Sequence, residues 1–432
     1  MKNITIVLLS TMVFAAGDES TAFQFEKDPH VIAKGRSPQF AARRSHGLMA
    51  IFTASAPGGS GADLFFASSA DVGDSFTAPQ RINNVPGEVS DHGENSAQLL
   101  VSPDESTLFA VWDARDSQNP IGSHLRFSRS GAMSPSWSPA ITIDDDPQAV
   151  SHSFQGAAVA PDGTIYVAWL DSREGKSKEH LMTGDTMTHS GGTATVYLAR
   201  SRDGGKTFEK NVRVAGNICP CCRVSVAIAL NRVFIAWRQV DAGDTRDIYV
   251  ASSSDRGAIW GKPVLVARDG WKIKGCPHVG PSLATLGNTV YVSWFSEGGG
   301  KPAVYLSSTT DGGESFSPKR VLSDGTFDPT HPRLTSNDDK LAVVFQARDA
   351  ARDSGWGKTG VYYREIYPDN SISKLVRAGE GKVGGSFPSA ALGLSGRIFV
   401  GWTEVSGGIA QAYLVRGRSL KEGFPTAQRS NW

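Results

Sequence analysis

The run Thr164-Ile165-Tyr166-Val167-Ala168-Trp169 is one of seven apolar segments ending in an aromatic residue that recur along this chain of 432 residues. Each segment is rich in β-branched and aromatic side chains, as a strand buried on both faces should be. The other six are LMAIF ending at Phe52, TLFAVW at Trp112, RVFIAW at Trp237, TVYVSW at Trp294, KLAVVF at Phe345 and RIFVGW at Trp402. One strand recurring at a regular interval predicts a repeat architecture.

Shorter strand-like segments surround each of these runs. Around Trp237 they are VSVAIA at 224–229, DIYVASS at 247–253 and VLVA at 264–267. None shows the 3.6-residue period of a helix. Four antiparallel strands per repeat predict an all-β propeller, with seven blades and six as the alternative. The last repeat lacks a good fourth strand, and we expect residues 30–33 to supply it, because closing the ring removes the open sheet edge.

Composition excludes several classes of protein. The formal net charge is +1, so no basic field favours a nucleic-acid partner. The 47 glycines and recurring Gly/Asp/Asn/Ser clusters suit short strands joined by tight turns. After the N-terminus no stretch approaches the roughly 20 apolar residues of a membrane helix. We therefore expect no membrane span.

The N-terminus has the pattern of a signal peptide. Lys2 precedes an apolar run over residues 4–16, which is too short to span a bilayer, and Ala16 and Ala22 are candidate cleavage points. The alternative is a buried first strand. We predict a signal peptide over the first 22 residues and a single propeller domain over 23–432. The protein would then be secreted or periplasmic, where paired cysteines persist.

Four eight-residue segments between the third and fourth strands share one pattern, S-x-D-x-G-x-[ST]-[FW]. Ser69–Phe76 and Ser201–Phe208 fit it, Thr309–Phe316 has Thr for Ser, and Ser253–Trp260 departs at one position. These segments resemble the Asp-box (BNR) repeats of the sialidase-like propellers, the neuraminidase superfamily. The resemblance covers essentially the whole mature chain.

The chemistry of the repeated segment is that of a turn. The aspartate carboxylate accepts backbone N–H groups, the glycine supplies a positive φ, and the aromatic residue packs under the hairpin. The resemblance implies that these turns lie on the blade periphery, away from the functional face. The aspartates Asp71, Asp203, Asp255 and Asp311 are thus expected to be structural.

Polar residues precede the inner strands of successive blades, and we expect them to converge on one axial mouth. They are Asp91-His92-Gly93-Glu94 in blade 2, His152 in blade 3, Cys219-Pro220-Cys221-Cys222-Arg223 in blade 4, Cys276-Pro277-His278 in blade 5, His331-Pro332-Arg333 in blade 6 and Ser386-Phe387-Pro388 in blade 7. Of these, His92, Glu94 and His152 are candidate ligand-binding residues.

All four cysteines fall in this set, and two interpretations remain open. One is a disulfide joining Cys276 to one of the cysteines at 219–222, which would link neighbouring blades. The other is a copper or zinc site, since thiolate and imidazole ligands suit Cu(I) or Zn(II). Its candidate ligands are Cys219, Cys221, Cys222, Cys276, His278 and His331. The segment 179–189, with two methionines flanked by histidines, is either a further copper-binding feature or a flexible polar loop.

The resemblance to sialidases also implies arginines that hold a substrate carboxylate, a Tyr–Glu nucleophile pair and an acid/base aspartate. Arg36, Arg223 and Arg333 are candidate arginines, and Asp91 is the candidate acid. No Tyr–Glu pair is evident, so the catalytic set is incomplete. The sequence predicts a glycan-binding or glycoside-processing propeller, with exo-sialidase-like hydrolysis one possible activity. The alternatives are a metal-binding propeller and a scaffold for a protein partner.

Overall fold

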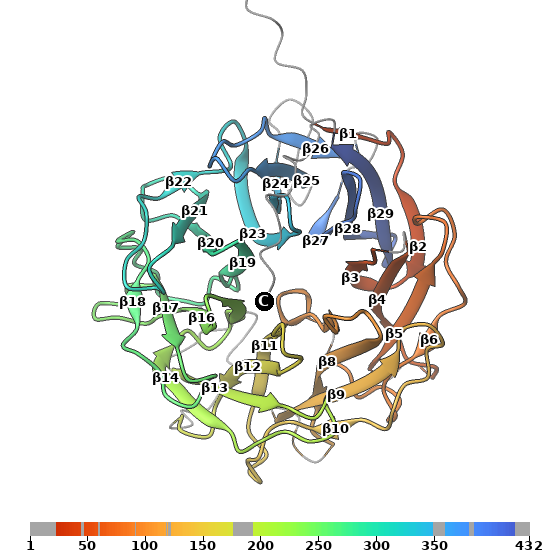
Figure 1. The fold of residues 1–432 in the computed structure, drawn as a ribbon, viewed down its shortest axis with the longest axis horizontal. Helices are drawn as coiled ribbons and strands as arrows, with labels where there is room; N and C mark the ends of the chain where they lie inside the picture. Colours follow the sequence, from red (N-terminus) through yellow and green to blue (C-terminus); the bar gives the residue numbers. More distant parts are fainter. Residues whose placement is uncertain are drawn as a thin grey trace, which may run out of the picture.

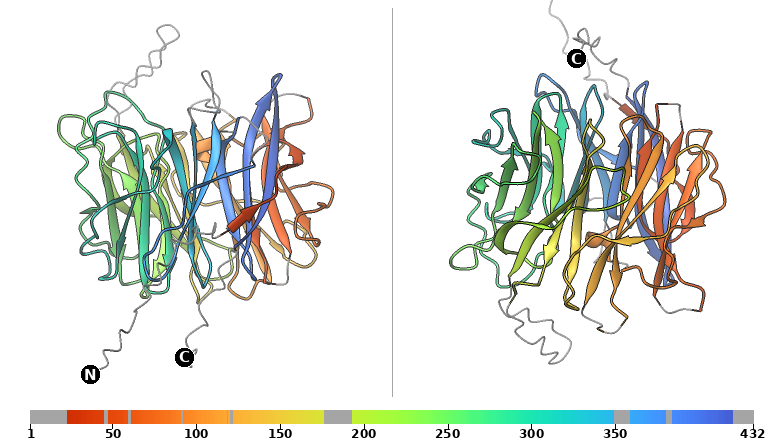
Figure 2. Two further views of the ribbon diagram at one scale, coloured as in Figure 1. Left: turned by 90° about the horizontal axis from the view of Figure 1, so that it is seen from above. Right: turned by 60° about the horizontal axis from the view of Figure 1, so that its bottom comes forward.

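The computed structural model describes residues 23–44, 47–58, 61–90, 92–117, 119, 122–175, 193–348, 359–379 and 384–419. These residues form seven antiparallel sheets arranged as a ring around a central axis (Figures 1 and 2). The predicted all-β propeller with seven blades is confirmed. Among the described residues the helical element is the single 3-10 turn η1 (Gly93–Asn95). No helix in this part of the chain is long and apolar enough to cross a membrane.

Each blade runs outward from an inner strand near the axis (Figure 1). The inner strands of blades 1 to 7 are β3 (Arg36–Ala42), β7 (Gln98–Val101), β11 (His152–Val159), β15 (Ser225–Ala229), β19 (Ser282–Leu286), β23 (Phe327–Ser336) and β27 (Ser386–Leu392). The second strands, which carry the aromatic-ended runs, are β4 (Leu48–Ser55), β8 (Thr107–Arg115), β12 (Ile165–Asp171), β16 (Arg232–Arg238), β20 (Thr289–Ser296), β24 (Leu341–Arg348) and β28 (Arg397–Ser406).

The outer strands complete the sheets. The third strands are β5 (Ala62–Ser69), β9 (Ser123–Gly131), β13 (Ala194–Ser201), β17 (Ile248–Ser253), β21 (Ala303–Thr309), β25 (Gly360–Ile366) and β29 (Ile409–Ser419). The fourth strands of blades 1 to 6 are β6 (Gln80–Arg81), β10 (Ile141–Thr142), β14 (Val212–Ile218), β18 (Val264–Leu265), β22 (Arg320–Val321) and β26 (Val376–Ala378).

The N-terminal strands close the ring. Strands β1 (Phe23–Phe25) and β2 (His30–Lys34) both pair antiparallel with β29, so that Phe23 lies opposite Ser419 and Val31 opposite Tyr413. The predicted closure by residues 30–33 is confirmed, and β1 extends it. The outer side of β29, the third strand of blade 7, is therefore paired with β1 and β2 and is not an open sheet edge where they pair.

Apolar side chains fill the space between neighbouring blades. Trp112 of blade 2 packs in one cluster with Met49 and Ile51 of blade 1, and Trp169 of blade 3 packs with Phe109 of blade 2. Trp237 and Trp294 occupy the same place in the next two interfaces. A blade therefore buries both faces against its neighbours, which explains why the second strands are apolar throughout.

The four repeated turns share one hydrogen-bond pattern, shown here for the turn at Asp203. The carboxylate of Asp203 accepts the Ser201 hydroxyl at 2.8 Å, the Thr207 hydroxyl at 2.6 Å, and the backbone N–H groups of Lys206 and Thr207 at 2.9 and 3.0 Å. Asp71, Asp255 and Asp311 accept the equivalent serine or threonine hydroxyl and backbone N–H of their own turns. All four lie in the connections between third and fourth strands, as expected.

The glycine of this turn also joins blades. Gly205 has a φ of 78°, and a Cβ there would lie 2.4 Å from the ring of Phe127 in blade 2. Phe208, the aromatic residue of the turn, contacts the same ring edge-on with centroids 5.0 Å apart. The turn thus needs glycine for its conformation and for the close approach, and it packs blade 3 onto blade 2.

We expect Asp203→Asn to lower the melting temperature by a few degrees at neutral pH. Burial alone would raise the pKa of Asp203, but hydrogen bonds from Thr207 and Ser201 hold that pKa well below the ordinary carboxyl range. Since the folded-state pKa is depressed, the carboxylate stabilises the fold above about pH 4 and loses this effect as the pH falls further. Thermal melting of both proteins at a series of pH values should show the two curves converging in acid. Lost ligand binding with unchanged melting would contradict a structural role.

Candidate binding site at the propeller axis

The axial ends of the inner strands share an unusual backbone feature. Five non-glycine residues there have left-handed conformations: Ser37, Phe154, His278, His331 and Phe387, with φ values of 51°, 57°, 52°, 54° and 51°. In β3, β11, β23 and β27 the pairing register shifts at this position, which marks a β-bulge. Such conformations cost about 1–3 kcal/mol each and gather at functional sites. Bulges also redirect side chains, so their recurrence in several blades indicates a functional site around the axis.

The side chains brought together here are called the axial cluster, and they come from blades 2 to 7. Glu94 and His92 lie at η1 in blade 2, and the remaining members lie at the start of later blades. The cluster consists of His92, Glu94, Phe154, Arg223, His278, His331, Arg333 and Phe387. The predicted convergence of axial residues therefore holds for these positions.

Glu94 is the electrostatic centre of the axial cluster. It is buried, and both of its carboxylate oxygens accept hydrogen bonds of 2.6 Å from Nη1 of Arg223, which is only 2% exposed. The backbone N–H of Gly280 donates to Glu94 at 2.5 Å. Burial alone would raise the pKa of Glu94, but Arg223, followed by His331 and Arg333, lowers it overall. Glu94 is therefore a carboxylate at neutral pH.

The arginines of the axial cluster have partners within the protein. Arg223 also donates through Nη2 to the carbonyl oxygen of Pro332 at 2.6 Å, which fixes both ends of its guanidinium. Arg333 donates to the Ser96 hydroxyl at 3.3 Å. Glu94 thus occupies the position on Arg223 at which a ligand carboxylate would bind. The hydrogen bonds among Glu94, Arg223, Gly280 and Pro332 thus connect blades 2, 4, 5 and 6.

Aromatic and imidazole rings surround this ion pair. The ring centroid of His92 lies 5.9 Å from that of Phe154 and 5.8 Å from that of His278. The ring of His331 lies edge-on to Phe387 with centroids 4.8 Å apart. Burial lowers the pKa of His331 to about 4, because it outweighs the opposing effect of Glu94. His331 is therefore a neutral imidazole at neutral pH, able to accept or donate a hydrogen bond.

The cysteines form a cluster beside the axial rings. A disulfide joins Cys221 to Cys276, with Cα atoms 6.2 Å apart, and so links blades 4 and 5. The predicted disulfide between neighbouring blades is confirmed. Cys219 and Cys222 are buried free cysteines, and Phe154 of the axial cluster packs against the group. Four cysteines thus supply one crosslink and two thiols.

The two free thiols differ chemically. The Sγ of Cys219 lies 3.6 Å from that of Cys222 and accepts a hydrogen bond from Nη1 of Arg246 at 3.1 Å. A hydrogen bond donated by Cys222 and the positive charge of Arg246 lower the pKa of Cys219 to about 6. Burial raises the pKa of Cys222. Cys219 therefore has thiolate character, which the sequence did not reveal because Arg246 lies 27 residues away.

The candidate metal residues do not all meet at one point. Among the described residues, the sulfurs of Cys219, Cys221 and Cys222 all lie within 4.8 Å of one another, the sulfur of Cys276 lies 3.9 Å from that of Cys219, and no metal-ligand group of that kind includes His278 or His331. Cys221 is already in the disulfide. The histidines instead contact the rings of the axial cluster.

Other predicted site residues lie elsewhere. Arg36 is exposed at the start of β3. His152 is fully buried between blades 2 and 3, where it faces Asp146 and Asp171 rather than the axial rings. Asp91 and the whole segment 179–189 lie outside the described residues.

A Tyr–Glu pair that was not evident from the sequence is present in blade 6. Tyr363 donates to Glu365 at 2.9 Å, and Lys340 donates to the same carboxylate at 2.7 Å. All three side chains are buried, and burial raises the pKa of Tyr363 well above its ordinary value. This pair is a structural element of blade 6, because a buried phenol with a raised pKa is a poor nucleophile.

Comparison with known proteins gives a likeness of fold. No family model matches the chain, and no curated protein matches it. A protein of unknown function from Dyadobacter fermentans superposes with a TM-score of 0.53 at 15% identity, covering 77% of this chain and 97% of that one. The polysaccharide lyase Uly1 gives a TM-score of 0.54 at 9% identity, covering 95% and 94%.

Sialidases are also among the similar structures. The Hadza microbial sialidase Hz136 has a TM-score of 0.49 at 15% identity, covering 73% of this chain and 66% of that one. The propeller fold that the resemblance to sialidases predicts is confirmed, with six four-stranded sheets and a seventh sheet completed by β1 and β2. At these identities the likeness extends to the fold alone.

Proposed function

We propose that this protein binds a glycan on the axial cluster. The observation that carries the proposal is the set of left-handed residues in successive blades that directs phenyl and imidazole rings to one place. Sugar rings present C–H faces that pack on such rings, and their hydroxyls exchange hydrogen bonds with imidazoles. The fold likeness to a polysaccharide lyase supports a glycan as the ligand class.

Binding is favoured over sialidase-type hydrolysis by the charges of the site. A sialidase-like mechanism needs arginines available for a substrate carboxylate, but Glu94 already neutralises Arg223. The Tyr–Glu pair that would supply a nucleophile is buried in blade 6. We therefore propose a glycan-binding propeller, secreted or periplasmic in accordance with its signal-peptide pattern. A scaffold role at the same face would appear as protein binding without glycan binding.

Phe387→Ala combined with His278→Ala should weaken polysaccharide binding at least about tenfold, because each ring contributes on the order of 1 kcal/mol of contact. The measurement is affinity electrophoresis in gels containing neutral or acidic polysaccharides, followed by calorimetry with the best binder. The matched control is His30→Ala, which removes an exposed imidazole on β2 at the periphery. Equal binding by the wild type and the double variant would refute the assignment, as would a wild type that binds no polysaccharide.

The cysteine cluster supports a second candidate function after reduction. The Sγ of Cys219 lies 3.9 Å from those of Cys221 and Cys276 and 3.6 Å from that of Cys222. Sulfur atoms at these separations suit a tetrahedral thiolate site for Cu(I) or Zn(II). We propose that metal binds here only when the disulfide is open. Elemental analysis of reduced and non-reduced protein tests this, and equal metal content in both would contradict it.

A further inference from the structure

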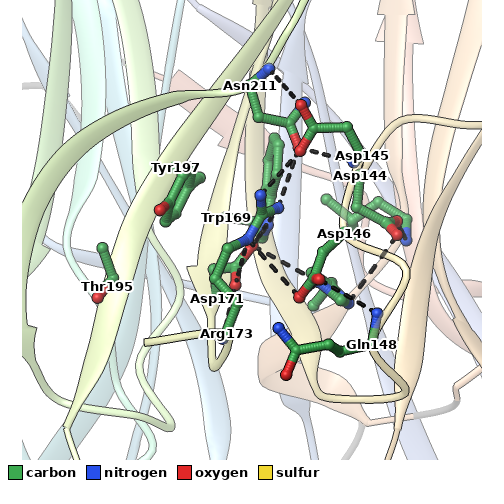
Figure 3. Close-up of polar contacts among 12 residues, drawn as sticks. Asp144, Asp145, Asp146, Gln148, Trp169, Asp171, Arg173, Thr195, Tyr197 and Asn211 are labelled. Atoms are coloured by element: carbon green, nitrogen blue, oxygen red, sulfur yellow. Dashed lines mark hydrogen bonds and ion pairs between the residues drawn. The ribbon is translucent and has the colours of Figure 1, made fainter. Parts of the chain in front are cut away.

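A buried polar cluster outside the axial site lies at the junction of blades 2 and 3 (Figure 3). It contains His152 at the start of β11, Asp171 at the end of β12, and Asp144, Asp145 and Asp146 in the segment after β10. Figure 3 shows Asp145, Asp146 and Asp171 gathered around the guanidinium of Arg173. The axial cluster shares no residue with this group.

The orientation of His152 is fixed by its Nδ1 atom. Nδ1 lies 2.7 Å from the carbonyl oxygen of Ser123, the first residue of β9, and a carbonyl only accepts, so Nδ1 carries the proton. The other nitrogen, Nε2, is fully buried and has no hydrogen-bond partner. A histidine that donates one ring N–H to a backbone carbonyl while its other nitrogen points into a polar site has the arrangement of a metal ligand.

Two carboxylates face this nitrogen at the same distance. Oδ2 of Asp146 and Oδ2 of Asp171 each lie 3.6 Å from Nε2 of His152. Oδ2 of Asp146 is likewise buried without a hydrogen-bond partner. A separation of 3.6 Å is too long for a hydrogen bond, but two ligands that each lie about 2.1 Å from one ion are roughly 3.0–3.6 Å apart.

The carboxylates of this polar cluster outnumber its cationic groups. Five carboxylates gather here: Asp116, Asp144, Asp145, Asp146 and Asp171. Their cationic partners are Arg173, His124 and His152. His152 has to be neutral to bind an ion through Nε2, so even with His124 protonated, five negative charges oppose two positive ones, leaving a net charge of −3. Burying uncompensated charge is costly, and a divalent ion offsets two of these charges.

The neighbours of Asp171 hold its carboxylate in place. Trp169 donates its indole N–H to Oδ2 of Asp171 at 2.8 Å, and Arg173 donates to Oδ1 through its backbone N–H at 2.9 Å and its Nε at 3.0 Å. Nη2 of Arg173 also lies 2.8 Å from Oδ2. These contacts orient Asp171 toward His152, as outer partners orient a metal ligand. Nε2 of His152 and Oδ2 of Asp146 have no hydrogen-bond partner, whereas Oδ2 of Asp171, 3.6 Å from Nε2, would bind an ion in addition to keeping its contacts with Trp169 and Arg173.

We propose that Nε2 of His152, Oδ2 of Asp146 and Oδ2 of Asp171 hold a divalent first-row transition metal ion that ties blade 2 to blade 3. One imidazole and two carboxylates suit Zn²⁺ or Mn²⁺. The ion is structural rather than catalytic, because all three ligand residues are buried. The site is independent of glycan binding.

The test is zinc binding by the full chain in its oxidised form. After treatment with a chelator, wild-type protein should take up one equivalent of Zn²⁺ with a rise in melting temperature. Asp146→Asn should weaken this uptake by roughly 100-fold or more, since even outer-shell partners of a metal contribute 10–100-fold. Asp145→Asn is the matched control, because Asp145 pairs with Arg173 and Asn211 and faces no free ligand atom. The zinc affinity of Asp145→Asn should stay near that of the wild type.

Both variants keep every cysteine, so zinc held by thiols cancels in the comparison. Equal zinc affinity in Asp146→Asn and Asp145→Asn would overturn the proposal. If Asp146→Asn fails to fold, the wild type alone decides: a melting temperature unchanged by chelator, zinc or manganese would overturn the proposal, and a rise with one bound equivalent would support it. Glycan binding is measured separately, so failure of this site leaves the proposed function untouched.

Discussion

Glu94→Gln is expected to destabilise the protein by about 3–5 kcal/mol, because it leaves the buried guanidinium of Arg223 without its counter-charge. The substitution keeps the shape of the side chain but removes the negative charge that Arg223 contacts through both carboxylate oxygens. Four blades meet at this contact, so we expect a lower denaturant midpoint for the whole domain. Chemical denaturation followed by tryptophan fluorescence measures the effect.

The control for this variant is Glu209→Gln. Glu209 pairs with Arg200 and Arg202 on the surface, and its side chain is 40% exposed. Surface pairs of this kind contribute about 0–1 kcal/mol. Similar losses in the two variants would mean that the axial ion pair is no more important than a surface pair, which would contradict its central place in the site.

Cys276→Ser should cost about 2–4 kcal/mol of stability, because it opens a crosslink between residues 55 positions apart. The wild-type protein, denatured without reductant, should show two reactive thiols per chain, from Cys219 and Cys222. The folded protein should react slowly, since both thiols are buried. Thiol titration with a chromogenic disulfide reagent measures the thiol count of the denatured protein and the reaction rate of the folded protein.

Cys222→Ser serves as the comparison, because it removes a thiol and keeps the disulfide. The denatured variant should then show one thiol, and its melting temperature should fall less than that of Cys276→Ser. A count of zero thiols in the denatured wild type would mean that Cys219 and Cys222 are also paired, and a count of four would mean that no crosslink forms.

The fold was accessible from the sequence because its signals are local. Each apolar run ending at a tryptophan or phenylalanine specifies a second strand, and the repeated turns locate the third and fourth strands. The closing strand at residues 30–33 followed from the incomplete last repeat. The Cys221–Cys276 link followed from equivalent positions in adjacent blades, which a propeller places side by side.

The contacts of the candidate site were less accessible. Glu94 and Arg223 are 129 residues apart, and their pairing depends on how far the η1 turn reaches across the axis. The left-handed conformation of Phe154 has no signal in the sequence, because phenylalanine rarely adopts a positive φ. His152 was assigned to the mouth from its position alone, but the pleat of β11 directs its ring between blades 2 and 3.

One missed feature did have a signal. Tyr363 and Glu365 are two residues apart in β25, so they lie on the same face of the strand and contact each other directly. The resemblance to sialidases placed such a pair near the axis. The buried position of this pair beside Lys340 explains why it stabilises blade 6 instead.

The central claim, that the axial cluster binds a glycan, is tested most directly by hydrogen–deuterium exchange with and without an oligosaccharide derived from the best-binding polysaccharide. We predict slower exchange in four segments around the axis, at residues 92–96, 276–280, 331–333 and 386–389, and no change in the peripheral turns. Protection confined to the repeated turns at 69–76, 201–208, 253–260 and 309–316, with the axial segments unchanged, would contradict the claim.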